Sequence, residues 1–282
     1  MRVPRKLVAL LTAAVLAGLA GGCTSGGQSQ AAGAKAAQET VQRSVDAENA
    51  GNVNDFLALW TDKGLRSYDA GSRADLESGK AQLGVDKTDI ADFSSTTVKG
   101  SSAEVIVDTQ VELGLYRLRF DLVRQSGKWL MDGFSFLGPT PPPANLTAVP
   151  VKAVEYGYDA DRSALASGDF ALSFDNEGKE QHEISIVSLP AMASQADAVL
   201  ALSKVRGTDY SGIPAGYQPL GHLAYAQPGE TGVFTLAAKL PPGHYAFACF
   251  LPVGGVDDFG NAKDPNADSH VARGMLFDFT VG

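Results

Sequence analysis

The chain divides into two stretches that differ in their pattern of hydrophobic and polar residues. In the first, the Ala-rich residues 34–49 carry Val41 and Val45 four positions apart, and a break at Gly51 precedes the apolar residues around Trp60. Spacing by four places side chains on one helix face, so this stretch predicts two helices. Alternating runs then predict an antiparallel sheet with strands at residues 96–98, 103–113, 116–124 and 129–136. Together these elements predict an α+β domain with helices followed by a curved sheet.

The second stretch consists of short runs in which every other residue is apolar. Three such pairs are Ile184 and Ile186, Tyr245 and Phe247, and Phe277 and Phe279. Because successive side chains of a strand face opposite sides of a sheet, each run predicts a strand with one buried face. The pattern predicts an all-β sandwich, interrupted by one helix in the Ala-rich residues 193–202.

A proline-rich segment separates the two stretches. Residues 139–143 include four prolines, which fit neither a helix interior nor a central strand and favour an extended spacer. We therefore expect a first domain at residues 34–137, a linker at 138–150 and a second domain at 151–282.

The amino-terminal residues have the features of an export signal. A positively charged start precedes an apolar run at residues 7–20, which is short for a membrane span, and small residues precede Cys23. The arrangement resembles a bacterial lipobox, in which the cysteine is acylated, with palmitate for example, and becomes the mature amino terminus. We expect a signal peptide at 1–22, a flexible tether at 23–33 and a lipoprotein anchored through Cys23 outside the cytoplasm, at the cell membrane. Ordinary cleavage that leaves a free Cys23 is the alternative.

Charge excludes one class of partner. The formal net charge is −9, and it becomes −12 without the signal's Arg2, Arg5 and Lys6. Since no basic cluster remains, nucleic-acid binding is not expected, and membrane attachment would depend on acyl chains rather than on a polybasic patch.

Candidate metal ligands lie in the second domain. His182, Cys249 and Met275 have the same parity as the buried residues of their runs, and His270 precedes Met275 by five positions. Cys249 is the one cysteine after position 23, so a disulfide scaffold is excluded. A trigonal set of two His and one Cys with a weak axial Met selects copper for electron transfer, because thiolate binds Cu(I) and imidazole tolerates both oxidation states. The four residues therefore predict a copper site.

Four segments of the second domain resemble those of a cupredoxin and occur in that family's order. They are Asn176-x-Gly178-x-x-x-His182, Pro228-Gly229-Glu230, Pro242-Gly243-His244-Tyr245 leading into Cys249, and His270-x4-Met275. The resemblance implies a Greek-key β-sandwich that holds type 1 copper through His182, His270 and Cys249, with Met275 as axial ligand. The first domain is similar to the nuclear-transport-factor-two-like cone in its order of elements and in Gly127-Lys128-Trp129.

Two features depart from the cupredoxin pattern. Residues 250–269 separate Cys249 from His270, where the family has only a few residues, so we expect an excursion that returns to the site. Glu183 follows the first histidine, where a small hydrogen-bonding residue is common, and a carboxylate that faced the site would favour Cu(II). His222 and His244 adjoin turn glycines, and we expect them to face solvent rather than bind metal.

The sequence therefore predicts an extracytoplasmic copper protein that transfers electrons and is not an enzyme. Its redox partner or copper-handling partner is not identified by the sequence. One alternative is storage, delivery or sensing of copper, and another is a metal-free binding module of the same fold, in which Cys249 is a small buried hydrophobe. All four histidines lie after residue 181, so a histidine base is excluded from the first domain, which we expect to be a docking or ligand-holding module.

Overall fold

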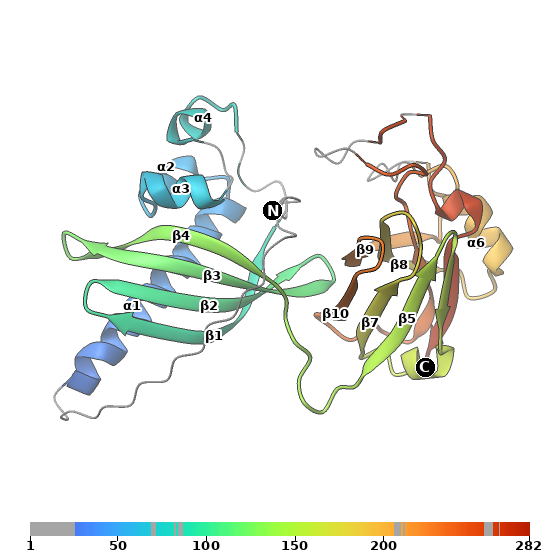
Figure 1. Cartoon of the computed structure of the whole chain (residues 1–282), viewed down its shortest axis with the longest axis horizontal. Coiled ribbons are helices and arrows are strands. Elements are labelled where there is room, and N and C mark those ends of the chain that lie inside the picture. The colour runs from blue at the N-terminus through green and yellow to red at the C-terminus, as the bar shows by residue number, and fades with distance from the viewer. Residues whose placement is uncertain are drawn as a thin grey trace. The chain divides into compact units, whose positions relative to one another are not determined.

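The computed structural model describes residues 26–68, 72–81, 83, 87–205, 210, 212–256, 262–264 and 266–282. These residues form two compact units (Figure 1), divided after Gly138, with Glu112–Leu115 assigned to the second unit. The signal peptide and Cys23 lie outside the described residues, so the expected lipid anchor stays a prediction. Within the described part of the chain, no helix combines the length and the hydrophobicity needed to span a membrane.

The first unit begins with the long helix α1 (Gly26–Asn49), which ends before Gly51 at a φ of 64°. Residues 26–33 form its first turns, which corrects the flexible tether expected there. Two alanines of this segment favour helix and three glycines disfavour it, and the Gln30 side chain donates a hydrogen bond to the Val98 carbonyl at 3.3 Å. Three short helices follow: α2 (Val53–Leu57), α3 (Asp62–Tyr68) and α4 (Arg73–Glu77).

Four strands of the first unit form one sheet in the order β1-β2-β3-β4. They are β1 (Asp89–Lys99), β2 (Ser102–Val111), β3 (Gly114–Gln125) and β4 (Lys128–Pro139). Strands β1, β3 and β4 contain the runs that the alternation predicted, whereas β2 ends at Val111, before the predicted end at residue 113. Val41 of α1, Trp60 and Phe120 belong to one buried cluster, and Trp60 donates its ring N–H to the Ser44 hydroxyl at 2.7 Å.

The second unit contains two four-stranded sheets, in the orders β10-β7-β5-β6 and β12-β11-β8-β9. The first comprises β5 (Ala148–Val154), β6 (Gly157–Ala160), β7 (Ala171–Asn176) and β10 (Thr231–Thr235). The second comprises β8 (His182–Leu189), β9 (Gln218–Ala226), β11 (Gly243–Ala248) and β12 (Leu276–Val281). Strand β5 runs parallel to β7. Since β4 ends at Pro139 and β5 begins at Ala148, the segment between strands is shorter than the expected linker at 138–150.

Short helices accompany these sheets, including the one that the sequence predicted and two that it did not. They are α5 (Arg162–Leu165), α6 (Gln195–Leu202) and the 3-10 helix η1 (Val271–Arg273). Helix α6 lies within the residues for which the sequence predicted a helix. Its Leu202 packs with Val187 of β8 and Ala246 of β11, on one face of their sheet.

The opposite face of that sheet forms the main core. Ile184, Phe247 and Phe279 are fully or almost fully buried there, in one cluster with residues of the other sheet. Cys249 belongs to this cluster, and His182, which has the parity of Ile184, is likewise completely buried. The alternation therefore correctly predicted which residues of these strands face the main core, but β8 and β11 are buried on their other face as well, against α6.

Candidate metal centre

Three separate chain segments bring the candidate ligands to one end of the second unit. His182 is the first residue of β8, Cys249 directly follows β11, and His270 directly precedes η1. Strands β8 and β11 are antiparallel, with Ser185 opposite Ala248. The start of one strand therefore meets the end of the other, and this register places His182 near Cys249.

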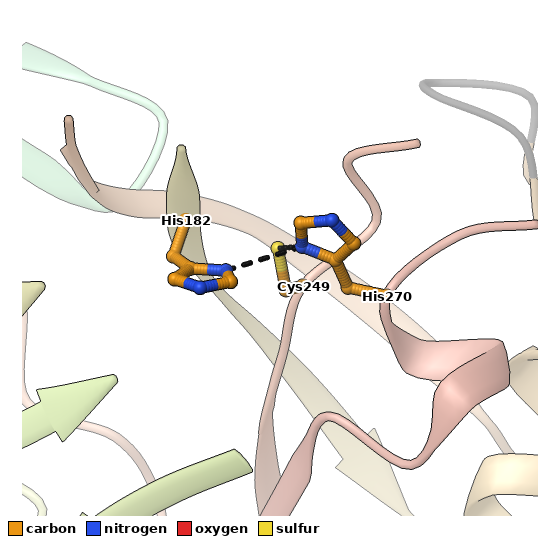
Figure 2. A group of neighbouring side chains, drawn as sticks. All are labelled: His182, Cys249 and His270. Carbon is orange, nitrogen blue, oxygen red and sulfur yellow. Dashed lines mark hydrogen bonds between the residues drawn. The ribbon is translucent and has the colours of Figure 1, made fainter. Parts of the chain in front are cut away.

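The three side chains point toward one another (Figure 2). The Nδ1 atoms of His182 and His270 lie 3.1 Å apart, and Cys249 Sγ lies 3.2 Å from His270 Nδ1. One possible ligand atom from each residue lies within 4.8 Å of the others, and all three residues are 0% exposed. Two imidazole nitrogens that share a first-row metal ion at about 2.0–2.1 Å are about 3 Å apart when the angle at the metal is near 100°. The observed spacing therefore fits donors to a single ion.

Met275, the fourth predicted ligand, is also fully buried and belongs to the same core cluster as Cys249. Its backbone N–H donates to the His270 carbonyl at 3.0 Å, and its carbonyl accepts from the Cys249 N–H at 3.4 Å. The backbone thus fixes Met275 beside two ligand residues. Its role as axial ligand stays a prediction.

The long excursion after Cys249 returns to the site, as the sequence predicted. The His270 N–H donates to the Leu251 carbonyl at 2.9 Å, and the Val271 N–H donates to the Cys249 carbonyl at 2.8 Å. Farther out, the Val253 N–H donates to the Asp268 carbonyl at 2.8 Å. The departing and returning segments therefore run side by side, and this pairing holds His270 next to Cys249.

The loop before His182 explains the spacing of the Asn176, Gly178 and His182 motif. Asn176 is 0% exposed; its amide donates to the Glu180 and Ala226 carbonyls at 2.8 and 2.9 Å, and its Oδ1 accepts from the Gly178 N–H at 2.9 Å. A Cβ atom at Gly178 would lie 2.6 Å from His182 Nε2. Glycine is therefore required by the closeness of the imidazole ring.

Burial shifts the pKa values of Cys249 and His182 in the metal-free protein. It raises the pKa of the Cys249 thiol well above its ordinary value, an effect that the Glu183 charge increases and that the Tyr158 hydroxyl and nearby backbone N–H groups oppose. Burial, followed by the nearby His270, lowers the pKa of His182 to about 4. His182 is therefore neutral at pH 7, the state in which imidazole donates a lone pair to a metal.

Glu183 does not face the site as the sequence analysis considered. Its Oε1 accepts from the Phe250 N–H at 2.8 Å, and its Oε2 lies 3.4 Å from His222 Nδ1. Because Glu183 is adjacent to His182 in a strand, its side chain projects to the other side of the sheet. The carboxylate thus holds the backbone of Phe250, the residue after Cys249, by a hydrogen bond.

The other two histidines are not solvent-facing turn residues, which corrects that expectation. His222 lies in β9, with Nδ1 2.7 Å from the Ser185 hydroxyl. His244 lies in β11, with Nδ1 3.1 Å from the Pro190 carbonyl. Their side chains are only 14% and 12% exposed, and neither belongs to the metal-site group found among the described residues. Both have structural hydrogen bonds instead.

Three residues around the centre were not identified from the sequence. Glu180 Oε2 lies 3.0 Å from His270 Nε2, the Tyr156 ring meets the His270 ring edge-on at 5.5 Å, and the Tyr158 hydroxyl donates to the Glu183 carbonyl. Glu180 lies in the loop between β7 and β8, where strand parity does not apply, so no local pattern marks it. The tyrosines come from the β5–β6 hairpin, whose approach to the site has no local signal.

No protein-family model and no curated protein matches the chain. Among solved structures, the chain is similar to auracyanin B at 20% identity, over 51% of this chain and 92% of that chain, with a TM-score of 0.32. It is similar to an auracyanin from the photosynthetic bacterium Roseiflexus castenholzii at 23% identity, over 47% and 94%, with a TM-score of 0.24. It is also similar to a nuclear-transport-factor-two-like protein of unknown function from Shewanella baltica at 10% identity, over 43% and 100%, with a TM-score of 0.30. The assignment of the metal centre therefore rests on the geometry of His182, Cys249 and His270 in this chain.

Proposed function

We propose that the second unit is a cupredoxin-like sandwich that binds one copper ion and transfers single electrons. His182 and His270 would bind the ion through Nδ1 and Cys249 through Sγ, with Met275 as a weak axial ligand. The convergence of these two nitrogens and one sulfur in a fully buried site carries the proposal.

The donor set favours copper over zinc. Structural zinc sites have four strong ligands, and catalytic zinc sites have three with an open position for water. Here three strong donors lie in a completely buried site. The fourth residue of the sequence pattern is Met275, whose thioether is a weak, soft ligand. A thiolate, two imidazoles and a thioether match the preference of a copper electron-transfer site.

Among the described residues, His182 lacks the hydrogen bonds of a purely structural histidine, and its Nε2 also lacks the outer partner that metal-ligating histidines normally have. A buried histidine with a purely structural role normally uses its ring nitrogens in hydrogen bonds. Within the described structure, His182 Nε2 is buried and has no hydrogen-bond partner. Its one polar contact is therefore Nδ1, which faces the other two donors.

When bound, copper supplies a one-electron couple. The chain contributes a buried site whose donors lie at the start of β8, directly after β11 and in a hydrogen-bonded loop. Such rigidity keeps the same ligands in both oxidation states, which electron transfer requires. Copper delivery would instead need an exposed, exchangeable site, and the complete burial of the three ligands disfavours this alternative.

Retention of the ion during a redox cycle tests the proposal. Copper-loaded protein would be reduced and reoxidised through a series of applied potentials, in the presence of a chelator specific for Cu(I). We expect a reversible one-electron transition without loss of copper. Transfer of the ion to the chelator on reduction would support delivery or storage instead.

We further propose that this electron carrier works outside the cytoplasm, anchored by acyl chains at Cys23 and exchanging electrons with a one-electron redox protein. The small residues before Cys23 and the absence of basic clusters in the rest of the sequence support it. Fractionation of cells that express Cys23→Ala tests the anchor, since a variant that stays membrane-bound would contradict it.

A further inference from the structure

Nε2 of His270, the ring nitrogen that does not contact Cys249, lies within hydrogen-bond distance of a carboxylate. Glu180 Oε2 lies 3.0 Å from His270 Nε2, and the same oxygen accepts from the Gly254 N–H at 2.8 Å. The His270 side chain is 0% exposed, while Glu180 is 24% exposed. An ionised carboxylate only accepts hydrogen bonds, so the proton of this contact is on Nε2 of the imidazole.

This hydrogen bond determines which nitrogen of His270 faces the centre with a lone pair. A neutral imidazole has one N–H, and its other nitrogen is an acceptor. With the proton on Nε2, the lone pair is on Nδ1, the atom that lies 3.2 Å from Cys249 Sγ and 3.1 Å from His182 Nδ1. The opposite tautomer would present an N–H to the place where a metal ion must bind.

The same carboxylate connects two loops. Gly254 lies in the excursion at residues 250–269, and Glu180 lies in the loop between β7 and β8. By accepting from both Gly254 and His270, Glu180 ties the start of the excursion to the ligand at its end. The neighbouring carboxylate of Glu155 accepts from the Lys179 N–H.

We propose that Glu180 is a positioning residue of the metal centre, which holds His270 in the tautomer and orientation that present Nδ1 to the ion. The inference rests on the proposed function for its consequence, but the tautomer itself is a property of the metal-free chain. Outer hydrogen bonds of this kind orient metal-ligating histidines, and their loss typically weakens metal affinity by about 10- to 100-fold.

The first test uses the full-length metal-free protein at neutral pH. Long-range 1H–15N NMR spectra distinguish the two imidazole tautomers, and comparison with His270→Gln assigns the His270 signals. We expect the Nε2–H tautomer in the wild type, a shift toward Nδ1–H in Glu180→Ala, and retention of Nε2–H in Glu180→Gln, whose amide oxygen also accepts. Glu177→Ala is the matched control, since Glu177 lies in the same loop but pairs with the exposed Lys152.

Unchanged tautomer populations in a folded Glu180→Ala variant would overturn the proposal. If that variant fails to fold, a wild-type Nδ1–H tautomer, or a Glu180→Gln variant that loses Nε2–H, would overturn it as well. Neither result depends on copper.

The second test measures Cu(II) affinity by competition with a chelator. We expect Glu180→Ala to bind about 10- to 100-fold more weakly than the wild type, and Glu180→Gln and Glu177→Ala to stay close to it. Equal affinities in the wild type and Glu180→Ala would contradict the positioning role. If the wild type itself fails to bind Cu(II), the proposed function fails, while the NMR spectra still decide the role of Glu180.

Discussion

The Nδ1 atoms of His182 and His270 face each other at 3.1 Å, although the two residues are 88 positions apart in the chain. One ring is fixed by a strand and by the Asn176 loop, and the other by the returning excursion. The same nitrogen of each ring faces the other ring, and His270 Nδ1 also lies 3.2 Å from Cys249 Sγ. Independent pieces of backbone thus build one set of donors.

Substitution of Gly178 should damage this arrangement without touching a ligand. In Gly178→Ala the added Cβ would lie 2.6 Å from His182 Nε2 and 3.1 Å from Asn176 Oδ1, so the ring must shift. We expect a loss of about 1–3 kcal/mol in the free energy of unfolding, measured with urea, and weaker Cu(II) binding. Gly212→Ala is the control, because its Cβ would find its nearest atom, Lys204 Cβ, at 3.9 Å. Equal behaviour of the two variants would show that the ring tolerates the methyl group.

Met275→Leu should alter the potential more than the affinity. Leucine has a similar volume, so a fully buried Met275 should be replaced at a cost below about 1.5 kcal/mol in unfolding free energy. The weak axial thioether contributes little to binding but slightly stabilises Cu(II), and its loss should raise the reduction potential. Potentiometric titration of both proteins measures this, and an unchanged potential would remove Met275 from the ligand set.

His270→Ala should abolish the type 1 spectrum, whereas His222→Ala should preserve it. His270 Nδ1 lies within 3.2 Å of both other donors, while His222 bonds to Ser185 outside the group of three ligands. The visible spectra of the two copper-loaded variants make the comparison. A variant lacking His270 that kept the wild-type spectrum would mean that the excursion does not return a ligand to the metal.

The sequence was sufficient to predict much of the site because strand parity is a local property. The parity of His182 with Ile184, and of Cys249 with Phe247, correctly placed both ligands on the buried face. Parity also explains why the Glu183 carboxylate projects away. By contrast, the cap of Glu180 on His270 depends on where an excursion of twenty residues returns, which no pattern along the chain specifies. Composition was misleading at residues 26–33, where contacts with the sheet stabilise helix.

Acid should destabilise the metal-free protein through His182. Its pKa is lowered to about 4 in the folded state, against about 6.5 when unfolded, so between these values the unfolded chain binds the proton more tightly. The contribution of His182 to the free energy of unfolding is therefore fully present above pH 6.5. It is lost as the pH falls toward 4, by up to about 3 kcal/mol. Urea unfolding across this range should show a steeper decline in the wild type than in His182→Gln. An equal decline of the unfolding free energy in the two proteins would contradict a lowered pKa for His182.

The visible absorption spectrum of the protein with one equivalent of Cu(II) tests the central claim most directly. If Cys249 Sγ, His182 Nδ1 and His270 Nδ1 bind the same ion, the spectrum should contain an intense thiolate-to-copper charge-transfer band. The band should be absent in Cys249→Ser, because a hydroxyl cannot replace the soft thiolate. A pale wild-type protein with only weak copper absorption, or a spectrum that survives Cys249→Ser, would contradict a copper centre at these three residues.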